Sequence, residues 1–268
     1  MKRNEVKKEK LIKKQLQKIE KRETKLLEKK KIKFIEEKLA PIQEKIENKI
    51  PKKLQQTLES AFESGFKLVF EKGVGIIEKS YNKEEKHASF DINHYTVQRQ
   101  TTNKNINKLD KTARKSIMLN QVVTTVEGGV LGVLGIGLPD IPILIGMLLK
   151  NIYEMSLSYG FDYTEDKEKL YILYLICVGI TKEEVQAGYS TYLDKLAKGQ
   201  IHLGEGAYNL DAVIKETAHR LAEAMLVAKF VQGLPIVGVV GGISNYTIMK
   251  DISKMARVKY KKRYLEGL

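Results

Sequence analysis

The chain has 268 residues, with 47 Lys or Arg against 33 Asp or Glu, so its formal net charge is +14. Hydrophobic residues make up 43% of it, and 20 Gly with 5 Pro exclude a fibrous or generally disordered chain. The single Cys excludes a disulfide framework and a multi-Cys zinc ribbon. These counts indicate a globular protein of one large or two small domains, and they identify no activity.

The positive charge is concentrated near the N-terminus. Residues 1–60 hold 20 basic and 10 acidic side chains, residues 61–120 hold 11 and 7, and residues 121–268 hold 16 and 16. Such asymmetry is typical of a basic segment attached to a neutral body. We therefore divide the chain into a Lys/Glu-rich helical arm, residues 1–50, and a helical domain, residues 51–268.

The arm is predicted to form a long exposed helix, because residues 1–40 lack Gly and Pro and are rich in strong helix formers. Apolar residues recur in it at spacings of three and four and give a narrow stripe. Glu23 and Lys30 interrupt the stripe, which argues against a sustained coiled-coil seam. No apolar run follows the first lysines, so we expect no secretory signal peptide and a cytoplasmic protein.

A basic amphipathic helix has several alternative partners: an anionic membrane surface, a membrane protein complex or other acidic protein face, or a nucleic acid. It is also compatible with a solvated helix that binds nothing. Nucleic acid ranks low, because Phe34 is the only aromatic residue before Phe62 and base stacking lacks a platform. The sequence does not indicate an oligomeric state.

The body begins with an expected amphipathic helix over residues 52–80. Residues 81–105 lose the apolar periodicity and are rich in Asn, Thr and Ser, so we predict a long loop or an irregular insertion there. Periodicity resumes from Ile106 to Leu119.

Residues 130–149 are the most apolar stretch, with one charge in 20 positions. Length alone would suit a transmembrane helix, but Asp140 near the centre and the helix breakers Pro139 and Pro142 argue against a simple span. We predict a buried connection followed by a helix that begins near Asp140. Its carboxylate would cap the free amides of the first turn, and a functional acid is the alternative.

Three further helices are expected over residues 165–180, 182–198 and 209–230. Cys177 lies in the apolar first of these and is predicted to be a buried, inert thiol. Thr181 and Glu184 have the spacing of a capping box that would open the second.

A second glycine-rich apolar segment, residues 231–249, echoes the first. Both contain a Gly-Leu-Pro triplet, at 137–139 and at 233–235, before an apolar helix. Small residues allow close helix approach, so we expect two similar hydrophobic helices, 131–149 and 235–249, packed together at the centre of the body.

Signatures of chemistry are sparse. The P-loop, Rossmann, GxSxG and HExxH motifs are absent, so a nucleotide enzyme or common hydrolase is disfavoured. Glu84-x-x-His87 and Glu216-x-x-His219, with Glu223 one turn further on, have the spacing of di-iron carboxylate bundles. Surface charge pairing is the favoured interpretation of both, and we expect no metal, no cofactor and no catalytic residues. The enzyme alternative rests on acidic residues near apolar segments and a His to join them: Glu127, Asp140, Asp162, His202 and His219.

One resemblance stands out in the glycine-rich segments. The residues that carry it are Gly128, Gly129, Gly137, Pro139, Asp140, Pro142, Tyr159, Gly160, Asp162, Pro235, Gly238, Gly241, Gly242 and Asn245. In these the chain resembles the bacterial EcsC protein family over roughly residues 50–265. That family is named from a protein encoded beside the subunits of an ABC transporter, and it has no agreed catalytic residues. The resemblance implies a place at the inner face of the cytoplasmic membrane and supplies no mechanism.

The sequence thus predicts an all-α, multi-helix bundle with two glycine-rich hydrophobic central helices and a long charged N-terminal helix. We expect a non-enzymatic protein that associates peripherally with a membrane or a membrane complex. The alternatives are an enzyme of unrecognised type that uses acidic residues near the glycine-rich helices, and a nucleic-acid-binding protein that uses the basic arm.

Overall fold

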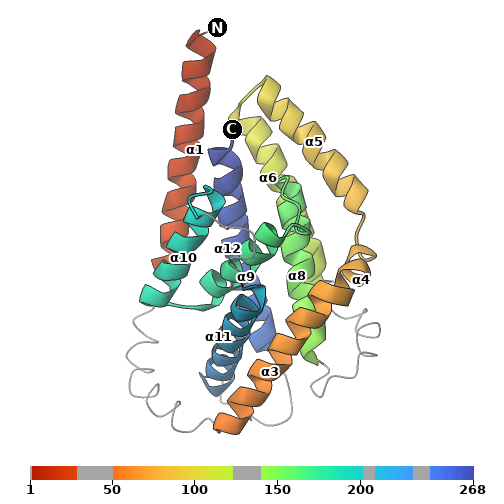
Figure 1. The fold of residues 1–268 in the computed structure, drawn as a ribbon. Coiled ribbons are helices and arrows are strands. Elements are labelled where there is room, and N and C mark those ends of the chain that lie inside the picture. The colour runs from red at the N-terminus through yellow and green to blue at the C-terminus, as the bar shows by residue number, and fades with distance from the viewer. Residues whose placement is uncertain (1, 29–50, 123–139, 202–208, 232–241) are drawn as a thin grey trace.

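A computed structural model describes residues 2–28, 51–122, 140–201, 209–231 and 242–268. Every regular element in these ranges is helical, which confirms the all-α prediction (Figure 1). The helices are α1 (Lys2–Glu28), α3 (Lys52–Leu68), α4 (Val74–Glu78), α5 (Lys83–Arg99), α6 (Asn103–Val122), α8 (Asp140–Ser158), α9 (Asp166–Ile180), α10 (Glu183–Ala197), α11 (Leu210–Val231) and α12 (Gly242–Glu266).

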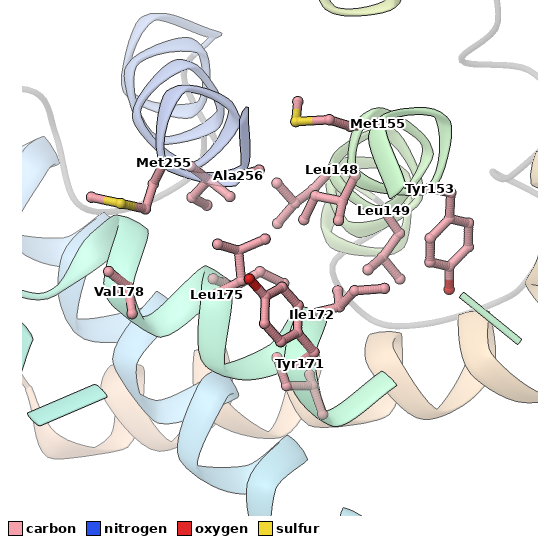
Figure 2. Packing of buried hydrophobic residues seen from close by; sticks show 14 of the residues in the cluster. Leu148, Leu149, Tyr153, Met155, Tyr171, Ile172, Leu175, Val178, Met255 and Ala256 are labelled. Carbon is pink, nitrogen blue, oxygen red and sulfur yellow. The ribbon is translucent and has the colours of Figure 1, made fainter. Parts of the chain in front are cut away.

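The last helix, α12, runs through the middle of the bundle. It packs against α1, α6, α8, α9 and α11 (Figure 1). Figure 2 shows side chains of α8, α9 and α12 gathered between these three helices, among them Leu148, Leu175 and Ala256, all buried. Helices α8 and α12 contain the described parts of the two predicted hydrophobic helices and pack against each other, whereas both Gly-Leu-Pro triplets lie outside the described residues.

Residues 81–105 differ from the prediction, because most of them form α5 and not a loop. The Asn82 side chain accepts a hydrogen bond from the Glu85 amide at 2.9 Å and so caps the first turn. Acidic residues in that turn also suit the helix dipole. Only Asn93 and Val97 of α5 are buried. A helix that buries so narrow a face leaves little apolar periodicity, and the prediction from periodicity was wrong for that reason.

The helix predicted over residues 52–80 is present with one irregularity. A π turn at Val69–Gly73 joins α3 to α4, which ends at Glu78. A π turn holds more residues per turn than an α-helix, so it shifts the face on which later residues lie. Val69 and Ile77, on either side of this shift, are both buried in the core.

The predicted helix over residues 165–180 is confirmed as α9, and Cys177 within it is buried. Burial raises the pKa of the Cys177 thiol to about 12, as expected for an inert thiol. The capping box is wrong: the Thr181 hydroxyl donates at 2.7 Å to the Cys177 carbonyl and so closes the end of α9. Lys182 is the N-cap of α10 and offers no side-chain cap.

Helix α8 begins at Asp140, as predicted, and Pro142 lies buried in its first turn. A proline fits there because the first amides of a helix have no partner within it. The Asp140 side chain lies outside the described residues, so its capping role stays a prediction. No helix in the described ranges is long and apolar enough to cross a membrane.

Close contact between α9 and α12 depends on Gly179. A Cβ on Gly179 would lie 2.8 Å from the Cα of Ile252 in α12, closer than packing allows. We expect Gly179→Ala to lower the free energy of unfolding by about 1–3 kcal/mol. Gly188→Ala in α10 is the matched control: its Cβ meets nothing within 4 Å, so stability should rise by roughly 0.5–1 kcal/mol. Urea unfolding measures both, and equal effects would contradict the described contact.

Candidate functional site

The C-terminal half of α12 carries five cations within residues 257–263. They are largely withdrawn from solvent, and the Lys259 side chain is only 1% exposed. Carboxylates from four other helices face them: Glu23 of α1, Asp110 of α6, Glu168 of α9 and Asp194 of α10. We call this arrangement the α12 ion-pair network. Because buried charges are costly unless paired, these contacts fix where each helix lies around α12.

Two carboxylates share two lysines where α1 and α10 meet α12. The Lys259 ammonium lies 2.5 Å from Glu23 and 2.7 Å from Asp194, and it donates to the Ser190 hydroxyl at 2.8 Å. Lys262 repeats the pattern, at 3.1 Å from Glu23 and 2.6 Å from Asp194. Glu23, which interrupts the apolar stripe in the sequence, thus helps to hold α1 against the body.

Asp110 of α6 is the second centre of the network. Arg257 makes a two-pronged contact with it, Nε to Oδ1 at 2.9 Å and Nη2 to Oδ2 at 2.5 Å, and the Tyr159 hydroxyl donates at 2.8 Å. Lys261 lies 3.4 Å from the same carboxylate. Burial alone would raise the pKa of Asp110, but Arg257 and Lys261 outweigh it and lower the pKa to about 2.

Glu168 of α9 is the third centre. It accepts from Arg263 at 2.6 Å and from the Tyr260 hydroxyl at 2.7 Å. The Arg263 guanidinium lies over two aromatic rings, 3.8 Å from the centroid of Phe161 and 4.7 Å from that of Tyr171. Stacking and pairing together hold a planar cation in place, a geometry that lysine would not reproduce.

Three residues of the family resemblance form the turn after α8. Gly160 has φ +82°, and a Cβ there would lie 2.2 Å from the Phe90 ring, so both conformation and space require glycine. Asp162 accepts from the amide and hydroxyl of Thr164, at 2.9 Å and 2.8 Å, and stabilises the turn. Tyr159 joins the turn to the α12 ion-pair network through Asp110.

The remaining residues of the resemblance are only partly described. Gly242 is the first residue of α12 and Asn245 lies in its first turn, but the Asn245 side chain is outside the described residues. The others lie outside the described residues altogether: Gly128, Gly129, Gly137, Pro139, Pro235, Gly238 and Gly241. A common site for all of them therefore stays untested.

The predicted acidic and metal-type motifs are engaged in local contacts. Glu216 and Glu223 both pair with Arg220, at 2.9 Å and 3.3 Å, which confirms charge pairing on α11. The His219 Nδ1 lies 2.7 Å from Glu59 of α3. No group of three or more His, Cys, Asp or Glu in the described ranges could hold a metal ion.

The described residues test the enzyme alternative at only one of its three acids. Of its three acids only Asp162 has a described side chain, and this carboxylate is occupied by Thr164. Glu127 and His202 lie outside the described residues.

Docking of α1 by one face leaves a charged face opposite. Gln15, Ile19 and Glu23 are buried against the body. On the other side six lysines at spacings of three and four are all exposed: Lys7, Lys10, Lys14, Lys18, Lys21 and Lys25. We call this set the α1 lysine face. No carboxylate among the described residues makes an ion pair with any of them. The spacing of these lysines can be recognised in the sequence, but only the packing of α1 against the body shows that they are exposed.

These features define a class of all-helical protein in which a central helix, α12, carries cations that pair with carboxylates of the surrounding helices. The chain belongs to the EcsC protein family, whose model matches residues 13–265. The match therefore includes most of α1, which the sequence resemblance had left out.

Two relatives come from Bacillus subtilis (strain 168). The chain is similar to Protein EcsC, with 24% identity over 199 residues, 73% of this chain and 80% of the relative. It is also similar to Uncharacterized protein YdbA, with 28% identity over 152 residues, about half of each chain. No solved structure matches.

The buried position of Glu23 predicts how firmly α1 is held. Glu23→Gln leaves Lys259 and Lys262 short of one buried negative charge, so we expect a loss of about 3 kcal/mol in the free energy of unfolding. Hydrogen exchange of the α1 amides should accelerate more than that of the other helices. Glu20→Gln, three residues away and exposed, is the control and should leave both measurements within about 0.5 kcal/mol of the native protein. Unchanged exchange in Glu23→Gln would contradict this docking role.

The low pKa of Asp110 predicts a pH dependence. Because its pKa falls from 3.8 to about 2 on folding, its charge stabilises the folded protein above about pH 4. That contribution, about 2 kcal/mol, is lost as the pH falls towards 2. The stability difference between native protein and Asp110→Asn should therefore shrink across this range, as measured by urea unfolding at a series of pH values. A difference that stays constant with pH would contradict the prediction.

Proposed function

We propose that this protein associates peripherally with an anionic membrane surface through the α1 lysine face. The proposal rests on the difference between the two faces of α1. One face is fixed to the body by Glu23 and Ile19, and the other presents six exposed lysines without an acidic partner among the described residues.

The strength of the proposed interaction comes from electrostatic attraction between the α1 lysine face and the anionic membrane. A lysine near an anionic leaflet contributes about 1 kcal/mol, so a row of six supplies several kcal/mol at low salt. The attraction falls off within a Debye length, roughly 8 Å at physiological ionic strength, and weakens as salt is added. Because α1 is already folded and docked, the lysines lose less conformational entropy on binding than they would on a free arm.

A membrane surface fits this face better than a nucleic acid does. The α1 helix contains no aromatic residue on which a base could stack. Lysines in a row along one exposed face also suit a plane of negative charge.

Vesicle flotation tests the proposal with two variants of equal charge. One replaces four residues of the α1 lysine face by glutamine: Lys10, Lys14, Lys18 and Lys21. The control replaces four exposed lysines elsewhere: Lys52, Lys53, Lys195 and Lys215. With phosphatidylcholine vesicles containing phosphatidylserine, we expect the native protein and the control to float at low salt and the lysine-face variant to stay at the bottom.

Three results would count against the proposal. They are no flotation of the native protein on anionic vesicles, equal flotation on neutral vesicles, and equal loss in both variants. Salt-sensitive retention on DNA that exceeds retention on anionic vesicles would favour the nucleic-acid alternative instead.

A further inference from the structure

The surroundings of Asp110 contain more positive charge than the carboxylate can balance. Arg257 and Lys261 of α12 contact it directly. Arg114 follows Asp110 by one turn of α6, and Arg22 of α1 lies within electrostatic range of Asp110, Arg257 and Arg114. We call these four cations the Asp110 cation cluster. Four positive charges around one carboxylate leave a formal excess of three.

The cluster lies where three helices come together. Figure 1 shows α1 and α6 on either side of the C-terminal half of α12. The Gln15 amide of α1 donates to Asn103 of α6 at 2.5 Å, which holds these two helices together two turns before Arg22 and Asp110. Arg22 and Arg114 are therefore presented from neighbouring helices beside the Arg257–Asp110 pair.

The cations retain hydrogen-bond donors for a ligand. Arg257 uses Nε and Nη2 on Asp110, which leaves donors on Nη1. Arg22 and Arg114 are exposed, and no carboxylate among the described residues lies within 4.0 Å of either. Burial and the charges of Arg257 and Arg114 lower the pKa of Arg22, so the cations are close enough to repel one another.

Arg257 and Lys261 already balance the charge of Asp110, so Arg22 and Arg114 add positive charge that no described carboxylate within 4.0 Å balances. An anion bound between the arginines would relieve their repulsion. Guanidinium groups recognise phosphate through paired, charge-assisted hydrogen bonds, and a dianion would balance two of the three excess charges. We propose that Arg22 and Arg114, with Arg257 and Lys261 behind them, form a binding site for a phosphate-ester anion, either a free phosphate or a membrane lipid headgroup.

The site differs from the α1 lysine face in kind. A row of lysines responds to charge density, whereas a cluster of arginines at one point distinguishes the shape and valence of a single anion. In its lipid form the inference rests on the proposed membrane association, and in its free-phosphate form it does not.

Binding of inorganic phosphate to the full chain tests the site in the absence of a membrane. We expect phosphate to raise the melting temperature saturably above a chloride control of equal ionic strength, and calorimetric titration to give one site. Arg22→Gln with Arg114→Gln should weaken phosphate binding at least about tenfold, a loss of about 1.4 kcal/mol. The matched control, Arg99→Gln with Lys195→Gln, removes two exposed cations elsewhere and should bind as the native protein does.

Vesicles distinguish the two sources of the anion. If the ligand is a headgroup, the native protein floats better with phosphatidic acid than with phosphatidylserine at equal surface charge. The Arg22/Arg114 variant should then lose this preference while its flotation with phosphatidylserine persists. If phosphate binds but no preference exists, the ligand is a free phosphate.

Failure of the site and failure of membrane association give different results. The site is overturned if phosphate stabilises no more than chloride and no headgroup preference exists, or if the Arg22/Arg114 variant binds phosphate as the native protein does. Loss of flotation in the lysine-face variant alone concerns only the membrane proposal and leaves phosphate binding intact.

Discussion

The pairing of Lys259 with Glu23 and Asp194 is the interaction on which the rest of the arrangement depends. A lysine that is 1% exposed is compatible with a folded protein only when carboxylates reach it. These two arrive from the first helix and from α10. The same principle repeats along α12 at Arg257 and Arg263, so the position of each surrounding helix is tied to a carboxylate at a particular height on one central helix.

Such a network favours one arrangement more than it adds stability. A buried ion pair gains little over a well-packed apolar pair, but a helix shifted by one turn would leave several charges unpaired. The charges therefore fix the register of α1, α6, α9 and α10, while the apolar contacts of Figure 2 supply the main driving force. On α1 the apolar stripe and Glu23 together determine which side faces the body, and the α1 lysine face lies on the opposite side.

Much of the fold could be predicted from apolar periodicity, as α8, α9 and α11 show, because each buries a broad hydrophobic face. The same criterion missed α5, which buries little, and misjudged Glu23, whose partners lie 236 and 239 residues away along the chain. The cations of α12 look like a solvated surface in the sequence. Five of them within residues 257–263, interleaved with Tyr260, were the available signal, but only the packing shows that they are buried. Ion pairs between residues far apart in the chain produce no periodic pattern in the sequence.

The position of α12 in the chain has a consequence for the order in which the protein is made. Its four carboxylate partners, residues 23, 110, 168 and 194, all leave the ribosome before the cations of residues 257–263. Until those cations emerge, the nascent chain holds α1, α6, α9 and α10 with their acids unneutralised and the face that will cover α12 open to water. Assembly of the bundle therefore waits for α12, and the newly made chain must tolerate its own incomplete core until this helix is inserted.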